Sequence, residues 1–196
     1  MTYRALPQPD YRWDDYRLVP IRLDDREPIR AWRNAQLQVL RQAAPLSTAD
    51  QDGYFLRVVL PLFSQEHPPQ LLFSLLHQEQ LIAYGGLVHI AWPDLRAEVS
   101  FLADPARAAD PATYRADFRA HLRLLGQVAF AGLHFRRLFT ETYDLRPAHV
   151  AILEEAGFQP EGRLRQHVQA APGIFADSLL HGQRAADYAT AFGTAV

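Results

Sequence analysis

Residues 146–158 read RPAHVAILEEAGF and carry the start and stop signals of one short helix. Pro147 suits the first helical turn, because its ring fixes φ and its missing N–H would find no partner there. Gly157 suits the position just after the last turn, where the backbone often becomes left-handed. The preceding run, residues 136–143 (RRLFTETY), alternates apolar and polar residues as a half-buried strand does. The stretch therefore predicts a strand followed by a helix over residues 147–156.

The same signals predict the other helices and strands of the chain. Alternation and composition favour strands over residues 16–23, 70–77, 80–91, 96–102, 161–170 and 174–183. Capping residues and helical spacing favour helices from Asp24 or Asp25 to about Leu40, from Ser47 to about Leu62, and over Pro111–Leu133. The Gly85–Gly86 pair predicts a bulge or a close backbone approach inside its strand. This order of elements predicts one mixed α/β domain.

Composition excludes several classes of function. A chain of 196 residues that is 48% hydrophobic is long enough for a sizeable core, and its formal net charge of −2 gives no footprint for nucleic acid or an anionic membrane. The absence of cysteine excludes disulfides, thiolate metal sites and a cysteine nucleophile. None of the eight histidines forms a ligand pair on a recognisable element, so we expect no metal. No apolar run reaches signal-peptide or membrane-span length, which predicts a soluble, cytoplasmic protein.

The motif at residues 146–158, continued by residues 159–165 (QPEGRLR), resembles the GNAT superfamily of N-acetyltransferases. It is similar to the pattern N-x-x-S-x-x-x-L-E-K-x-G-F-x-x-E-G-x-x-R of the branch that acetylates ribosomal-protein N-termini and amino-sugars. Asp177, Gly182 and the run Trp32-Arg33-Asn34 fit the same branch.

The resemblance implies a single α/β domain with a central mixed, mostly antiparallel sheet flanked by helices. It covers about residues 16–188, which leaves residues 1–15 as an N-terminal extension and residues 189–196 as a C-terminal tail. Because C-terminal strands in this fold often pair between subunits, a homodimer is compatible with it.

The resemblance also implies acetyl-CoA as co-substrate, in a cleft where the strands over 96–102 and 136–143 splay apart. Backbone groups near Phe101, Leu102 and Ala103 would then bind the pantetheine arm. In the family the next loop, [Q/R]-x-x-G-x-[G/A], wraps the pyrophosphate with its amides at a helix N-terminus. Residues 107–112 (RAADPA) stand in its place, so Arg107 and Ala112 match the family pattern.

This loop departs from the family pattern at its centre. Asp110 replaces the glycine, and its carboxylate can cap the helix amides that a pyrophosphate needs. Repulsion from a phosphate ~4–5 Å away would cost about 1–4 kcal/mol at effective dielectrics of ~80 to 20, unless Arg107, Arg115 and Arg119 offset it. We therefore expect weakened CoA binding. Arg146 replaces an Asn and would contact a phosphate or a substrate carboxylate instead.

Three side chains are candidates for proton transfer. Glu98, on the strand that lines the cleft, would act as general base, directly or through water; the alternative is a rim carboxylate paired with an arginine. His149 has a suitable pKa but could instead be a capping or surface residue. Tyr143 would protonate the leaving thiolate; the alternatives are Glu141, which shares its face of the strand, as the acid and an ordinary structural role for the tyrosine in the sheet.

An acceptor pocket would take Arg33 and Trp32 from the first helix and Arg165 from the penultimate strand, with Trp92 as a second aromatic wall. Both tryptophans are equally compatible with core packing. The expected function is acetyl-CoA-dependent transfer of an acetyl group to a primary amine of a small molecule, such as an amino-sugar, or to a peptide N-terminus. The alternative is a GNAT-fold ligand-binding or assembly module whose CoA binding is lost or weakened.

Overall fold

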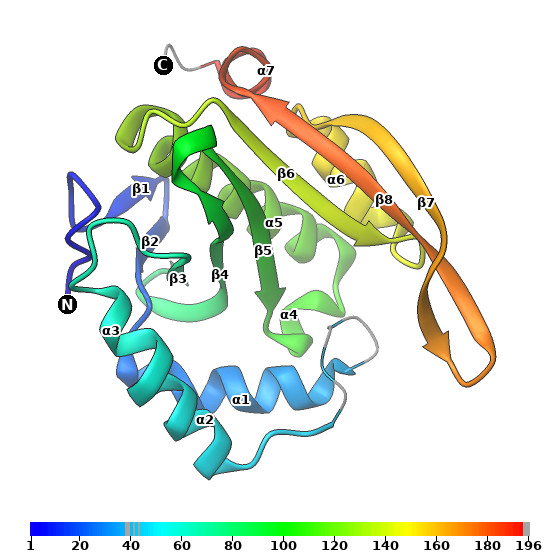
Figure 1. The fold of residues 1–196 in the computed structure, drawn as a ribbon, viewed down its shortest axis with the longest axis horizontal. Helices are drawn as coiled ribbons and strands as arrows, with labels where there is room; N and C mark the ends of the chain where they lie inside the picture. Colours follow the sequence, from blue (N-terminus) through cyan, green and yellow to red (C-terminus); the bar gives the residue numbers. More distant parts are fainter. Residues whose placement is uncertain (38–39, 41, 43, 194–196) are drawn as a thin grey trace.

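The computed structural model describes residues 1–37, 40, 42 and 44–193, and its centre is one eight-stranded sheet (Figure 1). The strands are β1 (Tyr11–Trp13), β2 (Tyr16–Pro20), β3 (Leu71–His77), β4 (Gln80–Ala91), β5 (Arg96–Ala103), β6 (Arg137–Tyr143), β7 (Gln159–Ala171) and β8 (Ile174–Arg184). Across the sheet they lie in the order β1-β2-β3-β4-β5-β6-β8-β7. Neighbouring strands are antiparallel except β5 and β6, which are parallel. The expected mixed, mostly antiparallel sheet is confirmed.

Helices flank this sheet. They are α1 (Arg26–Ala35), α2 (Thr48–Tyr54), α3 (Leu60–Leu62), α4 (Pro105–Ala108), α5 (Pro111–Gly126), α6 (Pro147–Glu155) and α7 (Ala185–Phe192). Short 3-10 turns, η1 (Leu23–Asp25) and η4 (Trp92–Asp94), and wider π-helical turns, η3 (Phe55–Val59) and η5 (Gln127–Gly132), complete the described elements. The helix α5 packs against β1, β2, β4 and β5, whereas α1 contacts α2 and β5.

Three helix ends lie where the sequence signals place them. Ser47 and Asp50 form a reciprocal capping box at the start of α2. Asp110 caps α5 with its side chain, and Pro111 occupies the first helical position. Gly157 follows α6 with a left-handed φ of 93°. Each of these local predictions is confirmed.

The termini of several elements differ from expectation. The strand expected over 16–23 ends at Pro20 and is followed by η1. The helix α1 ends at Ala35 rather than near Leu40, and part of the expected remainder lies outside the described residues. Segments expected to flank the domain also pack with it, because the buried core includes Tyr3 near one end of the chain and Phe192 of α7 near the other.

The Gly85–Gly86 pair lies where β4 passes very close to its neighbours. A Cβ on Gly85 would overlap the Ser100 carbonyl of β5, and one on Gly86 would overlap the Leu71 carbonyl of β3. Close backbone approach, one of the two sequence-based alternatives, is therefore the reason for glycine here. The irregular register of the β4–β5 pair comes later, between Val88 and Ala91.

The strands β5 and β6 separate soon after they meet. Their parallel pairing runs only from Arg96 opposite Arg137 to Glu98 opposite Phe139. Beyond that point β5 continues to pair with β4, and β6 continues to pair with β8. The two middle strands thus open into a cleft whose lining includes Phe118 of α5.

Candidate active site

A cavity of about 260 Å³ lies in the cleft between β5 and β6. Its lining brings together six side chains that the sequence singled out: Arg33, Glu98, Phe101, Tyr143, Arg146 and His149. They come from α1, β5, β6 and the start of α6, which are far apart in the sequence. The cleft therefore collects the proton-transfer candidates in one place.

Glu98 lies beside His89, a residue that the sequence analysis did not single out. The Nδ1 atom of His89 is 2.7 Å from Oε2 of Glu98, and the Glu98 side chain is only 12% exposed. Because an ionised carboxylate only accepts hydrogen bonds, Nδ1 is the donor of this bond, and in the neutral form of the ring the lone pair is on Nε2. The pair thus combines a buried carboxylate with an imidazole that is 65% exposed.

The backbone at His89 is unusual and places the ring. Its φ is 47°, a left-handed value that non-glycine residues adopt rarely and at some energetic cost. It falls in the irregular stretch between Val88 and Ala91, and Val88 lies opposite Glu98 in the β4–β5 register. Counting back through the predicted turn at residues 92–94 would have brought this histidine close to Glu98.

A second polar chain lies at the far end of β6. Arg146 donates from Nη2 to the Tyr114 hydroxyl over 2.6 Å, and that hydroxyl lies 2.7 Å from Nδ1 of His149. Since Arg146 can only donate, the Tyr114 proton points to His149. Burial holds the pKa of His149 well below its usual value, and its ring stacks on Phe118 at 4.2 Å. His149 is therefore a neutral ring whose Nδ1 is already engaged.

The side chains of β6 alternate as its sequence predicts. Thr140 and Thr142 are buried, while Glu141 and Tyr143 are partly exposed. All four contribute to the cleft cavity. Glu141 also lies 3.7 Å from the Nε2 atom of His167 on β7.

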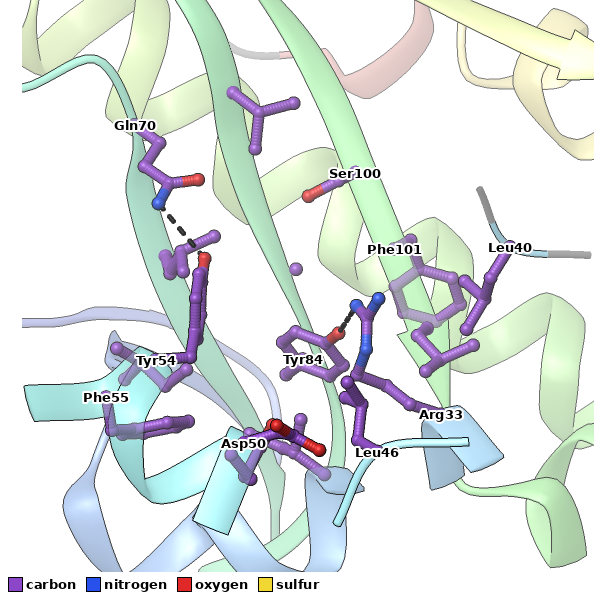
Figure 2. A pocket seen from close by; sticks show the side chains of 17 residues that line it. Arg33, Leu40, Leu46, Asp50, Tyr54, Phe55, Gln70, Tyr84, Ser100 and Phe101 are labelled. Carbon is purple, nitrogen blue, oxygen red and sulfur yellow. Dashed lines mark hydrogen bonds between the residues drawn. The ribbon is translucent and has the colours of Figure 1, made fainter. Parts of the chain in front are cut away.

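A second cavity, of about 340 Å³, lies between the sheet and the helices α1 and α2 (Figure 2). Its walls are mostly apolar, and Asp50 and Arg33 are the only charged side chains among its described lining residues. Arg33 donates to the Tyr84 hydroxyl over 2.6 Å, and Gln70 donates to the Tyr54 hydroxyl over 3.1 Å. Both cavities share the lining residues Arg33, Leu40, Val88, Ser100 and Phe101. The two spaces thus meet beside β5.

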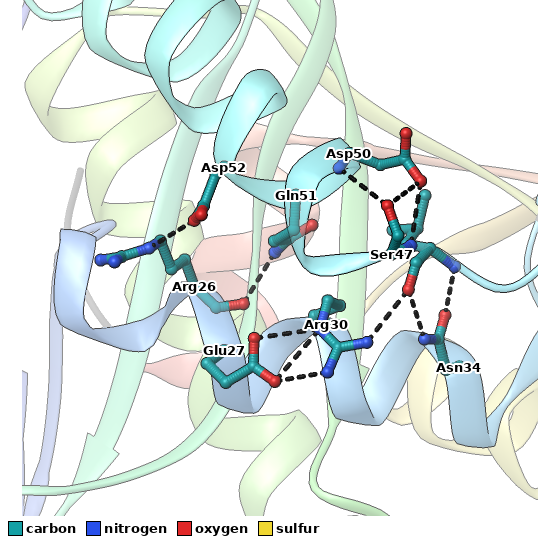
Figure 3. Close-up of polar contacts among 9 residues, drawn as sticks. Arg26, Glu27, Arg30, Asn34, Ser47, Asp50, Gln51 and Asp52 are labelled. Carbon is teal, nitrogen blue, oxygen red and sulfur yellow. Dashed lines mark hydrogen bonds and ion pairs between the residues drawn. The ribbon is translucent and has the colours of Figure 1, made fainter.

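Polar contacts hold α1 against α2 and fix the wall of this second cavity (Figure 3). Asn34 exchanges two hydrogen bonds with the backbone of Leu46, at 2.8 and 2.9 Å. The buried side chain of Gln51 donates to the Arg26 carbonyl, and the Arg26 guanidinium pairs with Asp52. In the expected run Trp32-Arg33-Asn34, Arg33 therefore faces the cavity and Asn34 anchors the adjacent loop.

The segment 104–114, where the pyrophosphate loop was expected, consists of two capped helix starts. Asp104 accepts from the Ala106 amide at 2.9 Å, and Asp110 accepts from the Thr113 amide at 3.0 Å. The other amides from Arg107 to Asp110, and that of Tyr114, donate to backbone carbonyls of this same segment. Hydrogen bonds from the Thr113 hydroxyl and amide lower the pKa of Asp110. These amides are thus already in use, and Pro105 and Pro111 have none.

The arginines near this segment are engaged as well. Arg107 binds Asp117 through two hydrogen bonds of 2.6 and 2.8 Å, and the fully buried Asp117 also accepts from the Tyr16 hydroxyl. Arg115 pairs with the Glu155 carboxylate, and Arg119 donates to the Glu155 carbonyl. Arg107 therefore ties α4 to α5 instead of pointing to a phosphate.

The remaining expected residues lie in different places. Leu102 lines the larger cavity, and the Ala103 carbonyl accepts from the Gln36 side chain at 2.9 Å. Ala112 and Arg165 are exposed, and neither they nor Trp32 are among the described lining residues of the two cavities. Trp92 packs edge-on against Phe135 and donates to the Pro68 carbonyl, which gives it a structural environment.

Metal clusters and membrane-spanning helices are both missing from the part of the chain that the structure describes. Among the described residues, no three His, Asp or Glu side chains are grouped so as to hold a metal ion. Within the same part of the chain, no helix has the length and apolar character needed to cross a bilayer.

Comparisons with known proteins bear on the family and the fold. Residues 18–173 match the acetyltransferase (GNAT) domain family. The fold is similar to spermidine N-acetyltransferase from Vibrio cholerae in complex with CoA and spermine, with a TM-score of 0.75, 17% identity, and coverage of 89% of this chain and 98% of that one. A chimera of the Vibrio cholerae enzyme SpeG and hSSAT gives a TM-score of 0.74 at 18% identity, with the same coverages.

No curated protein matches the sequence. At these low identities the solved structures support the fold alone, whereas the family match spans most of the chain. The chain therefore belongs to the GNAT family of acetyltransferases and is an N-acyltransferase enzyme.

Proposed function

We propose that this enzyme transfers an acetyl group from acetyl-CoA to the primary amine of a small molecule or to a peptide N-terminus. The observation that carries the proposal is the Glu98–His89 pair beside the junction of the two cavities. A thioester in the β5–β6 cleft and an amine in the larger cavity would meet next to this pair. That placement suits a direct transfer between two bound substrates.

The amine must lose a proton before it can attack, because an alkylammonium ion has no lone pair. His89 Nε2, with its tautomer fixed by Glu98, is placed to accept that proton, directly or through water. As the C–N bond forms and the C–S bond breaks, the sulfur leaves and takes a proton. Tyr143 lines the same cavity and is the side chain we assign to that second transfer. His149 is less suited to act as a base, because its Nδ1 already accepts from Tyr114.

The cleft suits the pantetheine arm of the donor better than its pyrophosphate. From Val99 to Ala103, β5 has no β6 partner among the described residues, so this edge is open to the amides of a pantetheine arm. The Ser100 and Ala103 carbonyls are exceptions, because the side chains of His121 and Gln36 already donate to them. The segment 104–114 does not fit a pyrophosphate well, since its amides from Ala106 to Asp110 and those of Thr113 and Tyr114 are bonded within the chain.

The larger cavity favours an acceptor with one amine and an apolar body. It is lined mainly by aliphatic and aromatic side chains, with Asp50 as its only described carboxylate. A polyamine carries several positive charges that would need several carboxylates, whereas a peptide N-terminus with an apolar first residue needs one. Of the acceptors considered, the peptide N-terminus therefore agrees best with this lining.

The test is an acetylation assay with acetyl-CoA and a panel of acceptors, read by mass spectrometry of the acceptor. The panel holds short peptides with apolar or acidic first residues, an amino-sugar and spermidine. We expect acetylated product, with apolar peptides first in rank and spermidine last. Release of thiol without an acetylated amine from any of these acceptors would contradict the proposal.

A further inference from the structure

Three aspartates hold the segment 104–114 in a closed form. Asp104 and Asp110 cap α4 and α5, and Asp117 binds the Arg107 guanidinium from inside the fold. The sequence repeat Ala-Asp-Pro-Ala places each cap directly before a proline, so each helix start combines a carboxylate acceptor with a missing donor. A phosphate approaching this segment would meet two carboxylates and no unused amide between Ala106 and Asp110.

The acyl end of the same cleft is built differently. There the cavity reaches Ser100, Phe101 and Tyr143, and β5 has lost its β6 neighbour. Donor groups that bind here would be the thioester and the pantetheine amides, which are neutral. The nucleotide end of CoA is anionic and would project toward the closed segment.

Building on the proposed function, we propose that this enzyme recognises its donor through the acyl-pantetheine portion alone and holds no pyrophosphate at residues 104–114. The chemical class of donor is thus any acyl thioester of pantetheine, with or without a nucleotide. The reaction is the same for either donor. The acyl group moves from sulfur to the acceptor nitrogen, the nitrogen loses a proton, and the sulfur leaves as a thiol.

The first test compares S-acetyl-pantetheine with acetyl-CoA as donors to the same acceptor. We expect kcat/KM values within about tenfold of each other, because the nucleotide adds little binding. A site that held the pyrophosphate with charge-assisted hydrogen bonds would prefer acetyl-CoA by roughly 100-fold or more, and such a preference would overturn the inference. We also expect that millimolar adenosine 3′,5′-bisphosphate does not compete with acetyl-CoA.

Calorimetry of the two donors provides a readout that does not depend on the acceptor. Similar dissociation constants for acetyl-CoA and S-acetyl-pantetheine support the inference. Binding and transfer with acetyl-CoA alone would leave the proposed function intact and overturn the inference. If neither thioester binds or reacts, the proposed function fails and the inference fails with it.

Two variants of one residue separate charge from capping. Asp110→Asn removes the charge and keeps a side-chain acceptor for Thr113, whereas Asp110→Gly removes both. We expect Asp110→Gly to tighten CoA binding roughly tenfold and Asp110→Asn to tighten it less, with pantetheine binding unchanged. Asp94→Asn, in the exposed turn η4, is the matched control. Unchanged CoA affinity in a folded Asp110→Gly protein would show that this carboxylate does not close the site.

Discussion

The two ends of the β5–β6 cleft contrast in how their polar groups are used. At the acyl end, Glu98, His89 and Tyr143 face or border a cavity, and β5 presents an edge that β6 does not cover. At the nucleotide end, the amides of residues 106–110 and the Arg107 guanidinium all bind partners within the chain. A group whose hydrogen bonds are already satisfied gains little from a ligand, because each new bond replaces an old one.

The contrast shows that a protein can keep a fold while one ligand-binding part of that fold differs from the family pattern. The strand separation that creates the cleft follows from sheet topology, and it persists here without the glycine-rich loop of the family pattern. The loop depends on single residues, and here Asp110 and Pro111 cap and begin a helix at its centre. Substitutions at each end of the cleft can test the contrast, beginning with the nucleotide end, where the polar groups already have partners.

The largest effect, a loss of stability, is expected at the nucleotide end, from Arg107→Ala. This change leaves the fully buried Asp117 with the Tyr16 hydroxyl but without its two guanidinium bonds. Breaking one side of a buried ion pair costs about 3–5 kcal/mol of unfolding free energy. Chemical denaturation would measure the loss. Arg115→Ala removes an exposed ion pair with Glu155 and should cost only about 0–1 kcal/mol, so equal losses would contradict the structural role of Arg107.

The next prediction concerns His121, which donates from Nε2 to the Ser100 carbonyl beneath the acyl end of the cleft. Burial lowers the pKa of His121 from 6.5 to about 4. Between these two pH values the unfolded chain binds a proton that the folded protein does not, so unfolding free energy falls as the pH falls. The loss contributed by His121 should approach roughly 3 kcal/mol near pH 4.

Denaturation at pH 7 and pH 4.5 in wild type and His121→Gln would measure this contribution. Glutamine keeps a donor for Ser100 and cannot ionise, so the pH dependence of its stability should be shallower. His67→Gln alters an exposed histidine and should keep the wild-type dependence. If the two variants lose stability equally as the pH falls, His121 is not a neutral buried group.

At the acyl end, Glu98→Gln should lower kcat by roughly 10²-fold, because the amide holds His89 poorly and cannot accept a proton. Initial rates with acetyl-CoA and a saturating peptide acceptor would measure it. Glu66→Gln, in an exposed turn, is the matched control and should leave the rate unchanged. Wild-type turnover in Glu98→Gln would remove this carboxylate from the mechanism.

The sequence predicted features that depend on local signals. Ser47, Asp110 and Gly157 mark helix ends through contacts within a few residues, and alternation placed the strands. It could not predict the partners of Arg107 or His149, because Asp117 and Tyr114 reach them only after α5 packs on the sheet. The terminal packing of Tyr3 and Phe192 depends on the same long-range contacts.

His89 shows the same limit at the active site. Its residue type gave no signal, since a lone histidine near a strand end has many ordinary roles. Pairing the two strands across the predicted turn brings it near Glu98, but the direction of the ring depends on the irregular β4–β5 register, which sets Val88 opposite Glu98, and on the left-handed φ of 47°. That irregular turn of the backbone was not visible in the alternation of residues 80–91.

The smallest expected effect is the added loss when His89 and Glu98 are both replaced, and it tests whether the two residues act as a unit. Asparagine tolerates left-handed φ better than most residues, so His89→Asn keeps the backbone and removes the imidazole. We expect kcat to fall roughly 10²-fold, as in Glu98→Gln, because the ring is the group that accepts the proton. In the double variant with Glu98→Gln, the loss should be close to that of either single variant, because the carboxylate acts through the ring. Additive losses would instead mean that the two residues contribute independently, and a near wild-type rate in His89→Asn would mean that Glu98 takes the proton itself.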